Sequence, residues 1–239
     1  MLYFLRKIEA MMRLFNKKRY GNISFAQSGE DLIVKRVLSR LGISDFSYLD
    51  VGANDPCRIN NTYLLYENGG SGVLIEPNAE LCLKIRRERP RDKVLNFGIG
   101  NIKGEASADY FTFENNVLNT FDEEDAERSK KDSVLKGVRK VALRNINDII
   151  DEEFNAVPHF INLDTEGFDL GILSSFDFEK HMPLVFCVET IKFSRSEGIE
   201  EKEDRIIDLM LKRGYMVYAD THINTIFVDK ERWFNRYRK

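Results

Sequence analysis

Short runs of apolar residues alternate along most of the chain with segments whose apolar residues recur at helical spacing. The runs are typical of buried strands, because a strand covered on both faces is apolar without interruption. Strands alternating with helices predict a parallel sheet that is covered on both faces. The strands are predicted at 48–51, 72–75, 94–97, 160–163 and 184–188, and the helices between them at 62–67, 79–89, 145–154 and 170–176.

The two ends of the chain depart from this alternation. Near the start, apolar residues at helical spacing predict a helix over 30–41 that stops at a glycine. Near the end, a helix over 201–212 precedes strands over 215–219 and 223–228, which the polar turn 220–222 joins. Such a short turn predicts a hairpin, so we expect the sheet to finish with an antiparallel edge.

Residues 101–140 are the least regular part of the chain. A strand pair over 106–113 and 138–143 flanks the charged run FDEEDAERSKKD, which we interpret as a solvated face or a mobile loop. The chain has no internal repeat, low-complexity tract or linker rich in proline and glycine. We therefore expect one domain over 23–239, preceded by a leader of residues 1–22.

The leader carries apolar residues at helical spacing among basic residues. A basic amphipathic helix can lie on an anionic membrane surface, but a packing or dimerisation helix has the same pattern. No apolar run reaches the roughly 18 residues of a membrane span, and Arg6 and Lys7 interrupt the first apolar stretch before it could form a signal-peptide core. We expect a cytoplasmic protein that can contact the inner face of a membrane through residues 1–20; the oligomeric state stays open.

Composition excludes some classes of function. The 239 residues are 43% apolar and 31% charged, which is ordinary for a globular protein. Thirty-six basic and 39 acidic residues give a net charge of −3, so we expect no nucleic-acid partner. Cys57, Cys82 and Cys187 form no CxxC pair, which argues against a disulfide framework and a structural zinc site and favours a reducing compartment.

The stretch SYLDVGANDP, residues 47–56, lies where open α/β sheets bind ligands, beyond the end of the first strand. Gly52 lets the backbone turn sharply, and Asp50 can face a cationic or hydrogen-donating group. A dinucleotide turn has three glycines where this one has a single glycine, and Asp50 and Asp55 would repel a pyrophosphate. An NAD(P)-dependent oxidoreductase is therefore an alternative function that the sequence does not favour.

The second predicted strand ends in GVLIEP, which places Glu76 at its carboxyl end. A carboxylate there can accept hydrogen bonds from both hydroxyls of a ribose. A ligand with a ribose, a positively charged amino-acid end and no phosphates suits both Asp50 and Glu76. S-adenosylmethionine is such a ligand.

A set of motifs runs through the chain: QSGEDLIV at 27–34, YLDVGAND at 48–55, NNTYLLY at 60–66, GVLIEPN at 72–78, INLDTEGFD at 161–169, FCVET at 186–190 and NTIFVDK at 224–230. In order and spacing they resemble the FkbM-type S-adenosylmethionine-dependent methyltransferases. The resemblance implies a class I methyltransferase (Rossmann-like) fold with three α/β/α layers, whose seven-stranded, mostly parallel sheet ends in an antiparallel hairpin. It also implies O-methylation of a small-molecule or glycan acceptor: a saccharide, glycan precursor or secondary metabolite.

One position departs from the family pattern. Pro56 stands where the family usually has glycine, and proline fixes φ and removes an N–H. A third hypothesis for the function is therefore a non-catalytic relative that only binds the cofactor.

The resemblance also implies which residues bind the cofactor. Asp50, Gly52 and Asn54 would line its methionine end, Glu76 would hold the ribose, and residues after the third strand would cradle the adenine. The whole set is Gln27, Asp50, Gly52, Asn54, Asp55, Glu76, Gly98, Ile99 and Asn101.

Two pairs of residues near this set have alternative roles. Gln27 and Asp31 match the N-terminal family signature and would cover the cofactor, but Ser28 and Asp31 also stand in approximate capping-box order. Asn61 and Thr62 are expected to cap the helix that follows them.

The reaction is expected at LDTEGFD, where the fourth strand ends. Methyl transfer is an in-line displacement, so the acceptor oxygen must lie on the axis of the breaking carbon–sulfur bond. A buried carboxylate within hydrogen-bond reach can take the proton of an alcohol as it attacks. Asp164 and Glu166 are the candidate bases, and Glu189, at the end of the fifth strand, is their candidate partner.

These carboxylates have other readings. They could bind a divalent cation, which we do not favour because no dedicated ligand spacing is present. Glu166 could be a simple turn residue before Gly167, and Glu189 could pair with Lys192 or Arg195. The loop lacks the Asn/Asp-Pro-Pro-aromatic signature of amine-directed methyltransferases, so oxygen is the expected acceptor atom.

Overall fold

The computed structural model describes residues 22–101, 106–165, 167–193 and 200–237. Its central sheet contains β1 (Ser47–Val51), β2 (Ser71–Ile75), β3 (Lys93–Leu95), β7 (Phe160–Leu163), β8 (Val185–Glu189), β11 (Tyr215–Asp220) and β12 (Asn224–Asp229).

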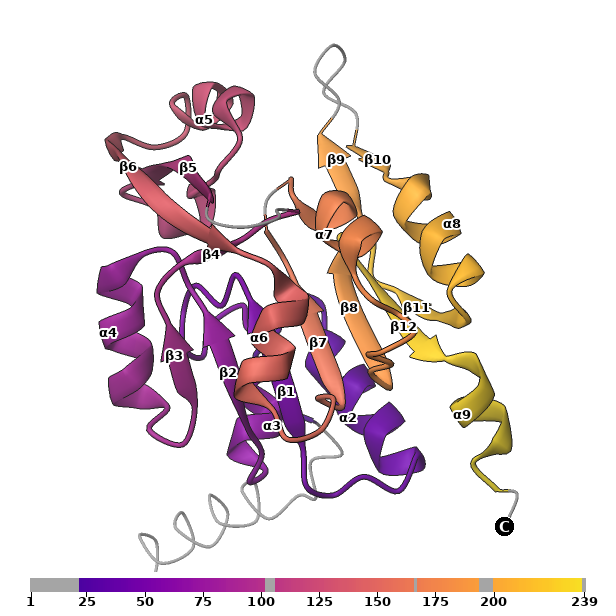
Figure 1. Ribbon diagram of the computed structural model, residues 1–239. Coiled ribbons are helices and arrows are strands. Elements are labelled where there is room, and N and C mark those ends of the chain that lie inside the picture. The colour runs from indigo at the N-terminus through magenta and orange to yellow at the C-terminus, as the bar shows by residue number, and fades with distance from the viewer. Residues whose placement is uncertain (1–21, 102–105, 166, 194–199, 238–239) are drawn as a thin grey trace, which may run out of the picture.

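The strand order in this seven-stranded sheet is β11-β12-β8-β7-β1-β2-β3 (Figure 1). The strands from β8 to β3 are parallel, whereas β12 is antiparallel to both β8 and β11. The predicted mostly parallel sheet with an antiparallel C-terminal hairpin is therefore confirmed. The hairpin inserts its second strand, β12, between β8 and β11, a detail that the hydrophobic pattern does not contain.

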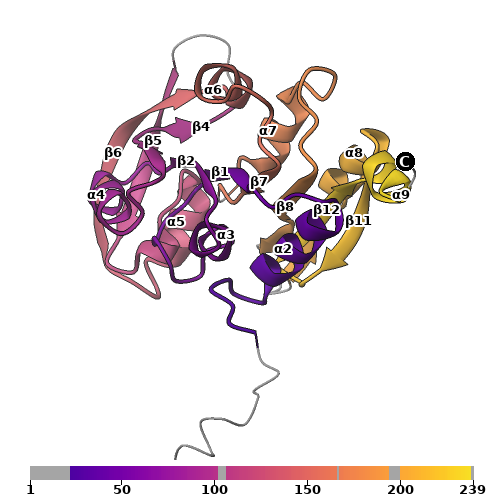
Figure 2. The ribbon, with the colours of Figure 1, turned by 90° about the horizontal axis from the view of Figure 1, so that it is seen from below.

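Helices cover both faces of this sheet (Figure 2). The helices α2 (Glu30–Arg40), α3 (Tyr63–Glu67) and α4 (Ala79–Glu88) pack on one face, and α6 (Ile146–Glu153), α7 (Asp169–Ser175) and α8 (Asp204–Lys212) pack on the other. The short α9 (Lys230–Asn235) follows the last strand. The predicted three-layer α/β/α arrangement is confirmed.

The helix α6 shows how the apolar pattern produces this packing. Ile146, Ile149 and Ile150 follow one another at helical spacing and are all buried against the sheet. Burial of each such side chain contributes about 1.5–3 kcal/mol. The side chain of Asn145 accepts a hydrogen bond from the Asn147 N–H and so begins the helix.

Strand β1 divides its side chains between the two faces. Leu49 and Val51 belong to the core under α6, α7 and α8, whereas Tyr48 belongs to the core under α2, α3 and α4. Because successive side chains of a strand point to opposite faces, Asp50 lies on the same face as Tyr48. Asp50 is thereby directed towards the start of α3.

Two regions differ from the elements that the sequence predicts. Residues 201–202, expected at the start of a helix, belong to β10 (Glu200–Lys202), which pairs antiparallel with β9 (Ile191–Phe193). The helix α8 therefore begins only at Asp204.

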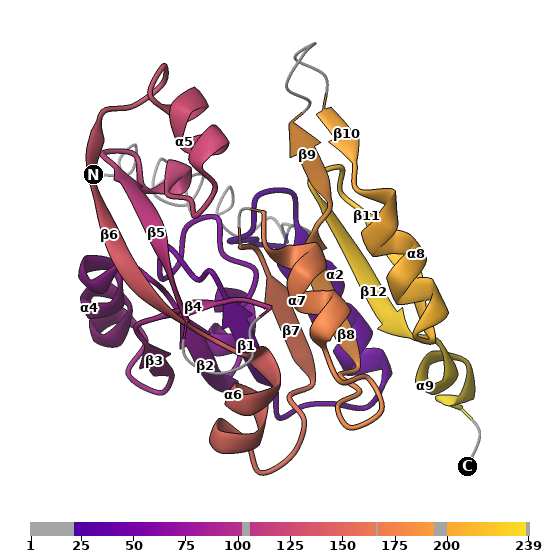
Figure 3. The same cartoon turned by 45° about the horizontal axis from the view of Figure 1, so that its top comes forward.

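The least regular stretch builds a second sheet of order β4-β6-β5, from β4 (Gly98–Ile99), β5 (Ala106–Phe113) and β6 (Leu135–Arg144). The predicted strand pair is confirmed as the antiparallel pair β5 and β6. Figure 3 shows this sheet rising above the carboxyl edge of the central sheet, opposite β9 and β10.

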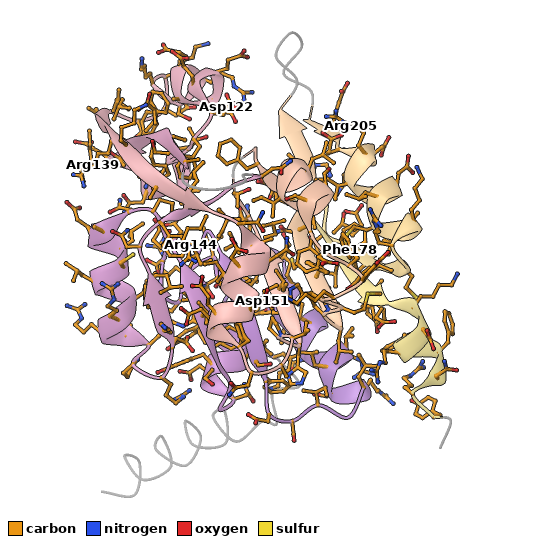
Figure 4. All side chains as sticks on the ribbon, viewed as in Figure 1. Asp122, Arg139, Arg144, Asp151, Phe178 and Arg205 are labelled. Atoms are coloured by element: carbon orange, nitrogen blue, oxygen red, sulfur yellow. The ribbon has the colours of Figure 1, made fainter. Side chains whose placement is uncertain are left out.

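The charged run contains a helix, α5 (Glu123–Ser129), so of its two interpretations the mobile loop is wrong. Glu123, Glu124 and Glu127 are exposed, as a solvated face requires. Asp122, labelled in Figure 4, caps this helix by accepting hydrogen bonds from the N–H groups of Glu124 and Asp125. Acidic residues fill its first turn, where they suit the positive end of the helix dipole.

The predicted leader helix falls on residues 1–21, which lie outside the described residues. In the described ranges, no helix has the length and apolarity to cross a membrane. The thiols of Cys57, Cys82 and Cys187 are free.

Candidate active site

A cavity of about 800 Å³ lies beyond the carboxyl ends of β1, β2, β7 and β8. The ends of these strands form one side, and β5, the 3-10 helix η1 (Asn116–Leu118) and α5 form the other. This is where an open α/β sheet is expected to bind its ligand. The volume is within the range of small-molecule sites.

Most of the predicted site residues meet at this cavity. Glu166 lies outside the described residues. Asn101 is not among the residues that line the cavity, and its Cβ lies beside Gly171 of α7, so its role next to the adenine stays a prediction. The predicted residues that do line the cavity are Gln27, Asp50, Gly52, Asn54, Asp55, Glu76, Gly98, Ile99, Asp164 and Glu189.

Gly52 brings the ends of β1 and β7 together. It has a φ of +85°, and a Cβ on it would lie 1.8 Å from the carbonyl oxygen of Asp164. Only glycine allows both this φ and this approach. The Asp164 N–H also donates to the carbonyl of Val51 at 3.1 Å. Asp50 and Asp164 therefore line one cavity.

Asp50 is buried in a network of donors. Its carboxylate accepts hydrogen bonds from Asn162 Nδ2 at 2.9 Å, Thr62 Oγ1 at 2.6 Å and Asn60 Nδ2 at 3.5 Å. A carboxylate has about four acceptor positions, so one is left for a ligand. The predicted capping roles of Asn61 and Thr62 are wrong: Thr62 makes no side-chain cap bond, and Asn61 Nδ2 donates to Asn162 Oδ1 at 2.9 Å.

Glu76 is buried at the end of β2. One carboxylate oxygen accepts the Asn54 N–H at 2.9 Å and the other accepts the Asn78 N–H at 2.7 Å. Burial raises the pKa of Glu76 to about 7, against the opposing effect of these two bonds. The orientation of this carboxylate in the cavity wall is thus set before any ligand binds.

Asp55 organises the loop after β1. One of its oxygens accepts the N–H groups of Cys57 and Arg58, at 3.1 and 2.9 Å, and the other pairs with Lys84 Nζ at 2.6 Å. Pro56 is buried but does not line the cavity. The departure from the family pattern therefore lies outside the cavity wall.

The two residues of the N-terminal family signature, Gln27 and Asp31, have different surroundings in the structure. Gln27 lines the cavity, whereas Asp31 is buried and accepts hydrogen bonds from Ser24 Oγ at 2.6 Å and the Phe25 N–H at 2.7 Å. The N-cap of α2 is Gly29, with no side-chain cap bond, so the predicted capping box is wrong. Asp31 holds the segment before α2 and does not face the cavity.

Asp164 and Glu189 form a pair of carboxyl groups at the ends of β7 and β8, joined by a side-chain hydrogen bond. Burial, Asp169 and Asp50 raise the pKa of Asp164 to about 7. A carboxyl group with that pKa can take a proton near neutral pH. The alternative pairing of Glu189 with Lys192 or Arg195 stays open, because these side chains lie outside those that the structure describes.

No group of three His, Cys, Asp or Glu residues in the described part of the chain is arranged to hold a metal ion. Glu166, which could complete such a group, is outside that part.

Several lining residues carried no recognisable signal in the sequence. Tyr110 of β5 and Phe121 line the cavity beside Gly98, with their ring centroids 4.6 Å apart. They offer an aromatic surface where the adenine is expected. Asn119 also lines the cavity; its Oδ1 accepts the Phe113 N–H at 2.8 Å, but its buried Nδ2 has no partner among the described residues.

The known proteins add three findings. The Methyltransferase FkbM domain matches residues 50–217. No curated protein matches the chain. Many solved structures are similar to the chain.

Three of these structures are methyltransferases. Precorrin-6y C5,15-methyltransferase from Geobacter metallireducens is 10% identical, with 89% of this chain and 94% of that chain covered and a TM-score of 0.42. A TehB-like SAM-dependent methyltransferase from Corynebacterium glutamicum is 10% identical, with 95% and 99% covered and a TM-score of 0.42. An O-methyltransferase from Bacillus cereus, in complex with SAH, is 12% identical, with 95% and 88% covered and a TM-score of 0.42.

The family match begins at Asp50 and includes Gly52, Glu76, Asp164 and Glu189. It covers more than half of the 239 residues. The chain therefore belongs to the FkbM methyltransferase domain family, and it is an S-adenosylmethionine-dependent methyltransferase with the class I fold.

Proposed function

We propose that this protein transfers the methyl group of S-adenosylmethionine to a hydroxyl of a saccharide, a glycan precursor or a secondary metabolite. The observation that carries the proposal is the Asp164–Glu189 carboxyl pair, which shares one cavity with Asp50 and Glu76. A base and a cofactor site in one cavity are what hydroxyl methylation needs.

The cofactor contacts follow from the chemistry of the lining residues. Glu76 accepts hydrogen bonds from the ribose hydroxyls, and Asp50 receives the ammonium group of the methionine end. Tyr110 and Phe121, beside Gly98, cover one face of the adenine.

In the reaction, the acceptor oxygen forms a bond to the methyl carbon as the carbon–sulfur bond breaks. The electron pair of that bond stays on sulfur, which leaves as neutral S-adenosylhomocysteine. The hydroxyl proton passes to Asp164. The Glu189 side chain, hydrogen-bonded to Asp164, keeps the base in place.

The charge of the cavity wall bears on the acceptor. Besides the residues above, Glu114, Asp125 and Asp132 line the cavity. The basic side chains among the described lining residues are Arg58 and Arg128, and Arg128 is ion-paired with Asp125. An acidic wall repels phosphate and carboxylate groups, so it favours an uncharged, hydroxylated acceptor.

The direct test uses methyl-labelled S-adenosylmethionine with a panel of saccharides, glycan precursors and lipid-linked glycans. Mass spectrometry of glycans from cells with and without the gene narrows the panel. We expect label on an oxygen of the acceptor. Label on nitrogen would refute O-methylation, and tight cofactor binding without transfer to any member would favour a non-catalytic relative.

Glu76→Ala should lower the affinity for S-adenosylmethionine by about 10- to 100-fold, because hydrogen bonds to a charged group contribute about 1.5–3 kcal/mol. Isothermal titration measures the change. The matched control is Glu80→Ala on α4, a change at an exposed side chain that does not line the cavity. Equal affinities in both variants would contradict the ribose contact.

The rate should also depend on pH in a defined direction. Asp164 accepts a proton only when ionised, so kcat/KM for the acceptor at saturating S-adenosylmethionine should rise with pH, with its midpoint at about pH 7, and level off at higher pH. The sulfonium charge of the bound cofactor can only move this midpoint downward. A rate that falls as the pH rises through this range would exclude Asp164 as the base.

A further inference from the structure

Arg89 follows α4 and is fully buried, although it does not line the cavity. A buried charge is tolerated only when it is paired and its donors are used. The guanidinium meets this condition. Its Nε donates to Asp92 at 2.7 Å, and its Nη1 donates to Asn60 Oδ1 at 3.2 Å and to the Pro56 carbonyl at 3.4 Å. Its Nη2 donates to Tyr48 Oη at 3.1 Å and to Thr62 Oγ1 at 3.0 Å.

One part of this network serves the fold. Asp92 balances the charge of Arg89 and also accepts hydrogen bonds from Tyr48 Oη at 2.9 Å and the Gly72 N–H at 2.8 Å. These contacts join the end of α4 to β1 and β2. They would be sufficient if Arg89 were only structural.

The other part reaches Asp50 through Thr62. Arginine can only donate, so Thr62 Oγ1 must accept from Arg89 and keeps its own proton for another partner. Two acceptors lie near that hydroxyl: an Asp50 oxygen at 2.6 Å and Asn60 Oδ1 at 3.0 Å. The carboxylate is closer and charged, so it takes the proton.

Asn60 is oriented in the same way. Its Oδ1 accepts from Arg89 at 3.2 Å, and also from the N–H groups of Thr62 at 3.0 Å and Tyr63 at 2.8 Å. Together these donors turn its Nδ2 towards Asp50 at 3.5 Å and towards the carbonyls of Ala53 at 3.2 Å and Asp55 at 3.1 Å. Arg89 thus sets the direction of the Thr62 hydroxyl on one Asp50 oxygen, and it helps two backbone N–H groups to set the direction of the Asn60 amide on the same oxygen. It also holds the loop after β1 through the Pro56 carbonyl. The other Asp50 oxygen is held by Asn162.

We propose that Arg89 is a positioning residue for the cofactor: through Thr62 and Asn60 it holds the Asp50 carboxylate ready for the ammonium group of S-adenosylmethionine. The inference rests on the proposed contact between Asp50 and the amino-acid end of the cofactor. It assigns a function to a residue outside the cavity.

Two ligands separate this role from a general role in folding. S-adenosylhomocysteine carries the amino-acid end, whereas 5′-methylthioadenosine carries the adenosine part without it. Thr62→Val removes the hydroxyl and keeps the shape of the side chain. We expect it to lower the affinity for S-adenosylhomocysteine by about tenfold, and to change the affinity for 5′-methylthioadenosine by less than about twofold.

Arg89→Lys keeps the charge but loses the forked geometry, so it should show the same selective loss. The matched control is Thr112→Val in β5, which removes another buried hydroxyl, one that donates to the Gly137 carbonyl at 3.1 Å. This control should bind both ligands as the unmodified protein does.

The outcomes are distinct. Unchanged affinity for S-adenosylhomocysteine in Thr62→Val and Arg89→Lys would overturn the proposal, and so would an equal loss for both ligands, which would indicate collapse of the whole site. Failure of the unmodified protein to bind S-adenosylhomocysteine would instead refute the proposed cofactor contacts themselves.

Discussion

Asp164→Asn lowers kcat for methyl transfer by about 100- to 10,000-fold, the range expected when a general base is removed. The amide has the shape of the carboxylate, but it cannot take the hydroxyl proton. We expect the affinity for S-adenosylhomocysteine to change by less than about threefold, because Asp50 and Glu76 remain. Turnover is measured with the acceptor that the labelling screen identifies, and cofactor affinity by titration calorimetry.

Glu189→Gln is the companion variant. It keeps a hydrogen bond to Asp164 but removes the second carboxyl group. We expect a smaller loss, about tenfold, if Glu189 only orients the base. Full turnover in Asp164→Asn would exclude Asp164 as the base. A larger loss of turnover in Glu189→Gln than in Asp164→Asn would indicate that Glu189 is the base and that Asp164 orients it.

Gly52→Ala should lower the free energy of unfolding by about 3 kcal/mol or more and remove cofactor binding. Its new Cβ would lie 1.8 Å from the Asp164 carbonyl oxygen, and this backbone atom cannot move without displacing the end of β7. Urea denaturation measures the loss of stability, and titration with S-adenosylhomocysteine measures binding.

Gly69→Ala is the control that separates the two causes of destabilisation in Gly52→Ala, the steric clash of the new Cβ and the backbone strain of a positive φ. Gly69 has a similar φ, +93°, but no atom lies within 4 Å of the place a Cβ would take. This variant should cost only about 1 kcal/mol and leave cofactor binding unchanged. Similar costs for Gly52→Ala and Gly69→Ala would show that β1 and β7 are not held as closely as the structure places them.

The fold was largely predictable from local patterns. The strand predicted at 160–163 has the same bounds as β7, and the helices on the two faces differ from prediction mainly at their ends. The largest errors were α5, whose polar composition concealed a well-capped helix, and residues 201–202, which belong to β10 and not to the predicted helix. In both places the hydrophobic period was too weak to identify the element.

The meeting of the main site residues was predictable for a geometric reason. Asp50, Glu76, Asp164 and Glu189 each stand at or near the carboxyl end of a strand, and parallel strands bring those ends to one edge of the sheet. Asn101, two residues beyond the end of β4, does not line the cavity.

The sequence by itself determined the family, the mostly parallel sheet and the edge that carries the site, because periodicity reports which face of each element is buried. Only the tertiary structure decided the partners. Arg89 and Thr62 lie behind Asp50, Asn162 contacts Asp50 across 112 residues of chain, and Phe121, packed against Tyr110, lies beside Gly98. Such pairings depend on how distant segments are placed in space. A pattern along the chain contains burial and spacing, but it does not contain the directions in which buried donors point.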